Sequence, residues 1–417
     1  MSIQIKNQFS DQRQQILNSY ESIKKLALSL DLTRGKPSAA QLDLSNDILS
    51  ISAENCIDSE GTDARNYGGL DGLPTMKKLF AEILDVGPEN IIVGGNSSLT
   101  MMYETLSRAC QFGVVDGDGP WNNITGRKFL CPTPGYDRHF LITEHLGFEL
   151  IPVDMNESGP DLDQVEALVS EDAAIKGIWC VPKYSNPTGV CYSPETVQRL
   201  ARMNCAASDF RIMWDNAYAV HHFSGELAEL ENISKCAEAA DNPNRVIQFA
   251  STSKITHPGS GVAAMAGSAA NMADARKHIG VQSIGPDKVN QLRHLQLFGN
   301  LSELATHMAK HAELVKPKFD LVLDIFEREL GARNIAQWSK PKGGYFINLD
   351  VPDGYAKKIV QLAAEAGVKL TTPGAPFPYG KDPKDCNIRI APTFPSLDEL
   401  EQAIDTLVVC IKLAVTE

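Results

Sequence analysis

Residues 245–254 of the sequence read RVIQFASTSK, an apolar run that ends in hydroxyl residues and Lys254. β-Branched and aromatic residues in a short run bounded by polar residues predict a buried strand. The pattern therefore places one lysine among hydroxyls at the end of a buried element. A lysine presented in this way can form an imine with an aldehyde, although Ser- and Thr-rich strand ends are also ordinary turn sequences.

Two further predicted strands end in polar residues that suit the same chemistry. Residues 175–181 form an apolar run, and Asn186 follows it in the sequence PKYSNPTG. Residues 210–214 form another run, which leads into Asp215 and, three positions later, Tyr218. Parallel α/β sheets bind ligands at the carboxyl ends of their strands, so side chains from separate strands can converge there. We therefore expect these side chains to meet the lysine in one site.

A phosphorylated pyridine aldehyde would use each of these groups. Lys254 would hold the aldehyde as an imine, and Asp215 would keep the ring nitrogen protonated. Asn186 and Tyr218 would hydrogen-bond the phenolic oxygen of the ring. The sequence therefore predicts a site for pyridoxal 5′-phosphate, with Lys254, Asp215 and Tyr218 as catalytic residues.

The order of these motifs resembles that of a known family. Asn-Pro-Thr-Gly (186–189), Asp-x-Ala-Tyr (215–218) and Ser-x-Ser-Lys (251–254) follow one another as in the pyridoxal-phosphate aminotransferases of fold type I, class I. Within that class the chain is most similar to the bacterial aspartate aminotransferases, on the motifs LTRGKP (32–37) and RNYGGL (65–70). The resemblance covers nearly the whole chain. It implies an α/β fold in which a large domain with a mainly parallel central sheet carries a smaller α+β domain.

The pattern of apolar runs agrees with this fold. Between residue 67 and about residue 280, strand-like runs alternate with helical patterns, which predicts a mainly parallel sheet. The runs lie at 91–93, 128–131, 149–153, 175–181, 212–214, 246–250 and 262–267. Helical spacing is found at 14–30, 288–330 and 354–366, and further strand-like runs at 343–349 and 387–391. We expect a large domain at residues 51–300 and a discontinuous small domain at residues 1–50 and 301–417.

Composition limits the classes of function. The chain has 417 residues and a formal net charge of −13, spread without a long block of like charges, which argues against nucleic-acid binding. Nine cysteines occur without a C-x-x-C spacing, which is typical of reduced thiols. No apolar stretch reaches the length of a membrane span. We expect a cytoplasmic protein with no membrane or nucleic-acid partner.

A phosphate site is predicted at residues 91–99, IIVGGNSSL. A strand, a glycine turn and a helix start provide free backbone N–H groups for an anion, although the same pattern begins many helices that bind no ligand. The resemblance implies phosphate contacts from both sides of the site: Asn96, Ser97, Ser98, Ser251 and Ser253.

The phosphate site departs from the family at one position. The family usually has a phosphate-binding arginine eight residues after the lysine, and this chain has Val262 there. Either backbone and hydroxyl donors, with Ser260 among them, bind more of the phosphate, or a cation arrives from elsewhere. Tyr67 belongs to the loop that crosses to the partner subunit in the family and would donate to the phosphate there. We therefore expect a homodimer whose site is shared across the interface.

Substrate recognition requires a fixed cation, and a guanidinium offers a carboxylate two parallel hydrogen bonds. Arg389 has the family position of the arginine that binds the α-carboxylate, and the Gly35 backbone would approach the same group. Arg34 and Arg65 rank first for a second carboxylate, with inter-subunit salt bridges as the alternative. Further candidates are Arg138 and Arg293.

Tyr136 would stack on the cofactor ring or, alternatively, pack as a turn tyrosine, and the neighbouring Arg138 and His139 receive no other role.

The resemblance implies an L-aspartate:2-oxoglutarate aminotransferase acting on amino acids and 2-oxo acids. Lys254 would move the proton between the substrate Cα and the cofactor, and the amino group would pass through pyridoxamine phosphate. The alternatives are an aminotransferase with an aromatic or other donor, a pyridoxal-dependent lyase, an aminotransferase-like regulator and a non-enzymatic anion-binding protein.

His307 and His311 have i,i+4 spacing, which we interpret as a solvated helix face, and we expect no metal site. His221 and His222 are expected to pack.

Overall fold

An eight-stranded sheet forms the centre of the larger lobe. The computed structural model describes residues 12–224 and 228–416, and the strand order of this sheet is β2-β9-β8-β7-β6-β3-β4-β5. The strands are β2 (Ile91–Val93), β3 (Lys128–Thr133), β4 (Glu149–Asn156), β5 (Gly159–Pro160), β6 (Ile175–Cys180), β7 (Arg211–Asp215), β8 (Val246–Ser251) and β9 (Ala263–Gly267). The pairs β4-β3, β3-β6, β6-β7 and β7-β8 are parallel. By contrast, β9 is antiparallel to both β8 and β2, and β5 is antiparallel to β4. The predicted mainly parallel sheet is confirmed.

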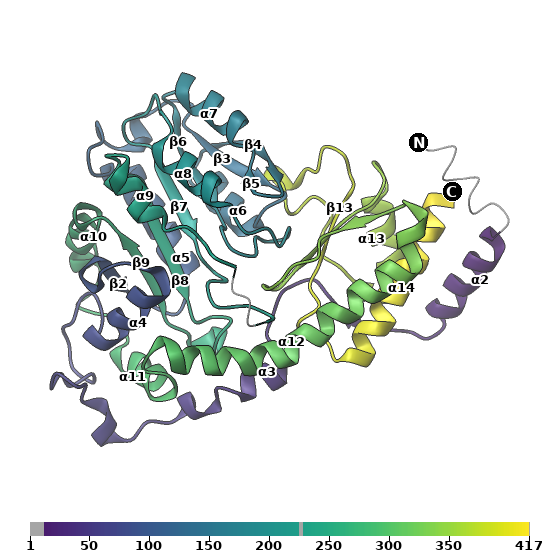
Figure 1. Cartoon of the computed structure of the whole chain (residues 1–417), viewed down its shortest axis with the longest axis horizontal. Helices are drawn as coiled ribbons and strands as arrows, with labels where there is room; N and C mark the ends of the chain where they lie inside the picture. The colour runs from purple at the N-terminus through teal and green to yellow at the C-terminus, as the bar shows by residue number, and fades with distance from the viewer. Residues whose placement is uncertain (1–11, 225–227, 417) are drawn as a thin grey trace.

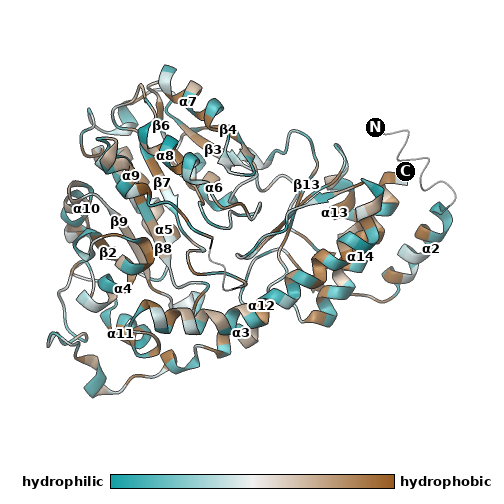
Figure 2. Cartoon of the chain, viewed as in Figure 1, coloured by the Kyte–Doolittle hydropathy of each residue, from teal (hydrophilic) through white to brown (hydrophobic). Residues whose placement is uncertain are grey.

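Helices cover both faces of this sheet. Met213 points into the core beneath α5 (Ser98–Phe112), α6 (Asp137–His145) and α10 (Ala269–Gln282). Ile212 and Trp214 point the other way, toward α7 (Leu162–Glu171), α8 (Pro194–Arg202) and α9 (Ile233–Ala239). This is the alternation that a strand buried on both faces requires. Figure 2 shows the apolar residues concentrated on the central strands and on the inward sides of the helices.

A smaller lobe is built around a second, antiparallel sheet. Its strands are β10 (Gln337–Trp338), β11 (Ile347–Asp350) and β13 (Asn387–Ile390), and β1 (Leu30–Asp31) pairs separately with β12 (Val368–Lys369). The helices of this lobe are α2 (Arg13–Lys24), α13 (Ala356–Glu365) and α14 (Leu397–Thr416). Of three further helices, α3 (Ala39–Asp43) and α4 (Pro74–Leu84) contact α12, and α11 (Lys288–Leu297) contacts α4. The long helix α12 (Leu301–Leu330) runs from one lobe to the other (Figure 1).

Two predicted helices have wrong limits. The helical pattern at 14–30 ends as a helix at Lys24, because the chain turns there and Leu30 pairs with Val368 in a parallel bridge. The pattern at 288–330 is divided between α11 and α12. Phe298 leaves the helix to become fully buried, and the Asn300 side chain accepts from the backbone N–H of Glu303 and starts a new helix.

The two lobes have separate hydrophobic cores, and α12 contributes to both. Leu304 and Met308 belong to the core that includes α4 and β2, whereas residues from Val315 to Leu330 pack in the small lobe with α2 and α14. The domain limits at residues 50 and 300 stay a prediction. Within residues 12–224 and 228–416, no helix has the length and hydrophobicity that crossing a bilayer requires.

Candidate active site

A cavity of about 160 Å³ lies where strands β6, β7 and β8 end. It brings together most of the residues predicted to bind the cofactor. The described residues that line it are Ser97, Ser98, Leu99, Met102, Tyr136, Val181, Asn186, Asp215, Ala217, Tyr218, Ser251, Ser253 and Lys254. Asn96 and Tyr67, which were also predicted, are absent from this lining. Residues from five separate segments of the chain thus converge, as expected for the carboxyl edge of a parallel sheet.

Lys254 has an environment that favours its neutral amine. Burial lowers the pKa of Lys254, and the nearby carboxylate of Asp215 opposes that shift. The Nζ atom lies 5.1 Å from the centre of the Tyr218 ring. The backbone is held as well, since the Lys254 carbonyl accepts a hydrogen bond from Tyr345 Oη at 3.3 Å and lies 3.3 Å from His221 Nε2. A neutral amine on a fixed backbone is suited to attack an aldehyde.

Asp215 is held by a histidine to which the sequence assigned no role. His139 Nε2 lies 2.9 Å from Asp215 Oδ2, and both side chains are almost fully buried. The imidazole stacks on Trp179 with 4.2 Å between ring centres and 7° between their planes. Among the described residues, Asp215 Oδ1 has no hydrogen-bond partner although it is buried. A buried acceptor of this kind in a cavity wall fits a protonated ring nitrogen.

Three tyrosines surround the buried end of the site. Tyr136 lines the cavity and meets His139 edge-to-face at 4.9 Å, and burial raises the pKa of Tyr136 to about 12. Burial also raises the pKa of Tyr218 well above its usual value. Tyr345 lies behind Tyr218 with 6.1 Å between their ring centres. The Tyr218 hydroxyl therefore stays protonated and can donate a hydrogen bond.

The start of α5 and the end of β8 form the polar wall where a phosphate was predicted. Ser97 precedes α5, and its side chain makes no capping hydrogen bond, so the first N–H groups of the helix are open. Ser251 Oγ and Ser253 Oγ lie 3.2 Å apart, and Ser253 Oγ donates to the Asn96 carbonyl at 3.4 Å. Asn96 thus acts on this wall through its backbone, while its side chain reaches the carbonyl of Gly259 at 3.4 Å.

The position of the usual phosphate arginine belongs to the core. Val262 is 1% exposed, and its backbone N–H donates to Thr252 Oγ1 at 2.9 Å. Among the described residues lining the cavity, Lys254 alone is a lysine or arginine. The wall where a phosphate was predicted therefore offers hydroxyls and backbone donors from the described residues.

Tyr67 is directed outward from its own chain. Its side chain is 83% exposed. The loop around it is nevertheless anchored, because Lys288 Nζ donates to the carbonyl of Asn66 at 2.9 Å and to that of Gly68 at 2.7 Å. A rigid loop that exposes a tyrosine can present it to another molecule.

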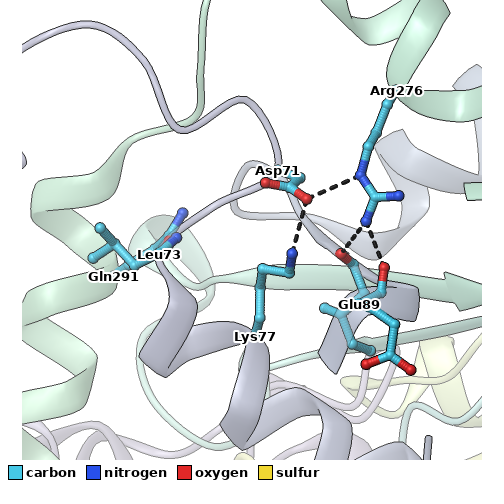
Figure 3. A network of polar contacts seen from close by, with 7 residues as sticks. Asp71, Leu73, Lys77, Glu89, Arg276 and Gln291 are labelled. Atoms are coloured by element: carbon cyan, nitrogen blue, oxygen red, sulfur yellow. Dashed lines mark hydrogen bonds and ion pairs between the residues drawn. The ribbon is translucent and has the colours of Figure 1, made fainter. Parts of the chain in front are cut away.

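A second anchor follows directly after this loop. Asp71 Oδ2 accepts from Lys77 Nζ at 2.8 Å and from Arg276 Nε at 2.9 Å (Figure 3). Arg276 Nη2 also donates to the carbonyl of Glu89 at 2.7 Å. The backbone N–H of Leu73 donates to the Gln291 side chain at 2.8 Å. These contacts join the loop to α4, α10 and α11. They restrict its movement relative to the large sheet.

Arg389 reaches the site from β13 in the small lobe. Its side chain is almost fully buried, and Nη1 donates to Asp137 Oδ1 at 2.8 Å and to Asn186 Oδ1 at 3.4 Å. Nε lies 3.4 Å from Thr371 Oγ1, and the guanidinium lies 5.0 Å from the centre of the Phe346 ring. The predicted carboxylate arginine is thus brought next to Asn186 in the cavity wall.

Gly35 lies against the same aromatic ring. A Cβ atom at position 35 would lie 2.7 Å from the Phe346 ring. A side chain there would therefore displace the ring on which the Arg389 guanidinium lies. Arg34 is exposed, and Arg65 forms an exposed pair with Asp63 at 2.7 Å.

The other two candidate arginines also lie outside the cavity lining. Arg138 is half-buried, and Arg293 has a buried Nε with no partner among the described residues. Among the described residues, the cavity lining contains no arginine, and Arg389 adjoins it through its contact with Asn186.

The two histidines on α12 correct one prediction. His307 and His311 are buried rather than solvated, with 3.1 Å between their Nε2 atoms. His307 Nε2 lies 2.9 Å from the Ile255 carbonyl, and Gln41 Nε2 lies 3.2 Å from His311 Nδ1. The segment after Lys254 covers this helix face. The described residues contain no group of three metal-ligating side chains.

Comparisons with known proteins cover nearly the full length of the chain. The model of the family described as aspartate amino-transferase matches residues 5–417. A protein of Mycolicibacterium smegmatis is 53% identical over 402 residues, which are 96% of this chain and 94% of that protein. The aspartate aminotransferase of Corynebacterium glutamicum is 45% identical over 403 residues, which are 96% of this chain and 93% of its own length.

Solved structures agree with these matches. The crystal structure of an aspartate transaminase from Corynebacterium glutamicum superposes with a TM-score of 0.96 at 44% identity, covering 98% of this chain and 97% of the other. The α-aminoadipate aminotransferase LysN of Thermus thermophilus, complexed with N-(5′-phosphopyridoxyl)-L-leucine, shares the fold at a TM-score of 0.74 and 21% identity, over 92% of each chain.

Proposed function

Because the chain belongs to the aspartate amino-transferase family, we propose that it transfers the amino group of L-aspartate to 2-oxoglutarate with pyridoxal 5′-phosphate as cofactor. The observation that carries this proposal is the cavity in which Lys254 meets Asp215, whose Oδ1 atom is buried without a partner among the described residues. The choice of aspartate rests on the 45% identity to an enzyme named for that substrate.

The residues of the cavity fit this cofactor group by group. Lys254 would bind it covalently, and Asp215 Oδ1 would accept from the ring nitrogen. Tyr218 and Asn186 would hydrogen-bond its phenolic oxygen. The phosphate would lie at the start of α5 among the hydroxyls of Ser97, Ser98, Ser251 and Ser253. When bound, the cofactor withdraws electrons from the substrate Cα and so acidifies the Cα proton.

The side chains around the cofactor would divide the remaining work. Lys254, with its lowered pKa, would take the proton from the substrate Cα as a neutral amine and deliver it back. His139 would keep the Asp215 carboxylate in place. Arg389 would hold the α-carboxylate, and Gly35 would leave room for the aromatic ring beneath that arginine. Tyr136 would lie against the cofactor ring.

We also propose a homodimer in the cytoplasm. The exposed, anchored Tyr67 loop supports a site completed by a second subunit, with Arg34 as a candidate contact to the substrate. The nine cysteines are all free, which supports a reducing compartment. Sedimentation of the purified protein should give twice the chain mass, and a monomer with full activity would contradict the shared site.

The test of the function is product analysis with pure, cofactor-loaded protein. L-Aspartate and 2-oxoglutarate together should give oxaloacetate and L-glutamate in equal amounts, and the Lys254→Ala variant should give neither. Aspartate should turn over better than alanine or phenylalanine at equal concentration. Ammonia release without an oxo acid would indicate a lyase instead, and faster turnover of phenylalanine would indicate an aromatic donor.

A further inference from the structure

The guanidinium of Arg389 carries an acidic partner from its own chain. Asp137 Oδ1 lies 2.8 Å from Arg389 Nη1, and the two side chains are 26% and 6% exposed respectively. Asp137 stands at the first position of α6, immediately after Tyr136 in the cavity wall. A carboxylate therefore already occupies the cation that the proposed substrate needs.

Arg389 has no pair of neighbouring N–H groups that are both free to bind a substrate carboxylate. Nη1 contacts the Asp137 carboxylate and, at 3.4 Å, Asn186 Oδ1, while Nε faces Thr371 Oγ1 at 3.4 Å. Of the three guanidinium nitrogens of Arg389, only Nη2 has no hydrogen-bond partner among residues 12–224 and 228–416. A carboxylate that binds two parallel N–H groups must use Nη2 together with Nη1 or Nε. It must then displace either Asp137 or the longer contact to Thr371.

Charge identifies Asp137 as the group that has to move. Thr371 is neutral and can remain beside a bound carboxylate, whereas two carboxylates on one guanidinium repel each other. The pair also joins the two lobes, because Asp137 belongs to α6 beside the large sheet and Arg389 belongs to β13. A backbone hydrogen bond from Gly135 N to the Pro376 carbonyl, at 2.8 Å, crosses between the lobes nearby. Release of Asp137 would loosen one of these inter-lobe contacts.

We propose that Asp137 is an internal competitor for the substrate's carboxylate: it neutralises Arg389 in the ligand-free protein and is displaced when substrate binds. This inference rests on the proposed function. Exchange of one carboxylate for another keeps the guanidinium neutralised, whereas a ligand without a carboxylate that displaced Asp137 would leave Arg389 unpaired. Asp137 thus lowers the affinity for every ligand whose carboxylate binds Arg389, because that carboxylate must first displace it.

The test is the affinity for succinate, a dicarboxylate that has no amino group to transfer. Cofactor-loaded wild-type protein and the variants Asp137→Asn and Asp137→Ser are titrated with succinate by calorimetry. Removal of a partly exposed competing charge should tighten the dissociation constant about three- to tenfold in both variants. The Asn variant keeps an uncharged acceptor of the same length for Arg389, and the Ser variant draws its acceptor back by one bond, so agreement between them assigns the effect to charge.

Asp163→Asn is the matched control. Asp163 is also an acid in the first turn of a helix of the large lobe, and it pairs on the surface with Arg199. Its variant should bind succinate as the wild type does. Equal or weaker succinate binding by both Asp137 variants, with wild-type melting temperature and cofactor content, would overturn the inference and show that Asp137 orients Arg389. Absence of succinate binding by the wild type would overturn the proposed dicarboxylate substrate and this inference with it.

Discussion

His139 Nε2 lies 2.9 Å from Asp215 Oδ2, while Oδ1 of the same carboxylate is buried without a partner among the described residues. The two oxygens therefore have separate tasks. One fixes the carboxylate to a histidine that is itself stacked on Trp179, and the other is left for a ligand. A fixed acceptor at the end of β7 is what a protonated pyridine nitrogen requires.

Asp215→Asn should reduce kcat about a hundredfold or more, since the cofactor ring would lose the charge that keeps its nitrogen protonated. Cofactor binding should fall much less, because Lys254 and the phosphate wall remain. The measurements are single-turnover rates with aspartate and cofactor content after gel filtration. A loss of cofactor that fully accounts for the loss of rate would contradict this role.

His139→Gln should lower kcat about tenfold by freeing the Asp215 carboxylate, with a smaller change in KM. The control is His145→Gln, which changes an exposed histidine in the last turn of the same helix. Steady-state kinetics of both variants check the prediction. If His139→Gln reduces thermal stability without changing kcat, the histidine serves packing alone.

The rate at which apoprotein binds pyridoxal phosphate covalently should rise with pH and level off below the usual range of a lysine. The reason is that burial lowers the pKa of Lys254, so the neutral amine is available at lower pH. The Asp215 carboxylate opposes that shift, and Asp215→Asn should therefore move the midpoint to still lower pH. Stopped-flow absorbance gives both midpoints. A move to higher pH in the variant would have the wrong sign.

Acid should destabilise the protein through the histidine pair on α12. Burial lowers the pKa of His311 to about 4, with His307 adding to the shift, whereas an unfolded histidine titrates near 6.5. Between these values the unfolded chain binds more protons, so stability is full above about pH 6.5 and falls as the pH drops toward 4. The contribution is roughly 1 kcal/mol per pH unit.

His311→Asn should therefore lose less stability between pH 7 and pH 5 than the wild type. Thermal unfolding at both pH values measures the difference. His145→Gln, which alters an exposed histidine, should leave the pH dependence unchanged. An identical pH dependence in His311→Asn and wild type would assign acid sensitivity to other groups.

The sequence predicted the elements whose signals are local. Asn186, Asp215 and Lys254 each lie within a few positions of the end of an apolar run, and the carboxyl edge of a parallel sheet brings them together. The glycine turn before α5 is likewise a contiguous pattern. These residues could be found because each lies within a few positions of the strand that presents it.

The contacts that sequence could not supply join distant segments. His139 and Asp215 are 76 positions apart, and Asp137 and Arg389 are 252 apart, with no pattern that links either pair. The break between α11 and α12 follows from burial of Phe298 in a core formed by other elements. Covering of α12 by the segment after Lys254 likewise makes its histidines buried where spacing indicated a solvated face.

The most direct test of the proposed function is the absorbance of the purified, cofactor-loaded protein before and after addition of L-aspartate alone. We expect an imine band of the bound cofactor that disappears in favour of the pyridoxamine band, with one oxaloacetate released for each site. In Lys254→Ala we expect no imine between protein and cofactor that borohydride could reduce to a permanent covalent bond. A band that aspartate leaves unchanged while phenylalanine or alanine converts it would contradict the aspartate proposal. Protein that binds no pyridoxal phosphate at all would contradict the account of the cavity.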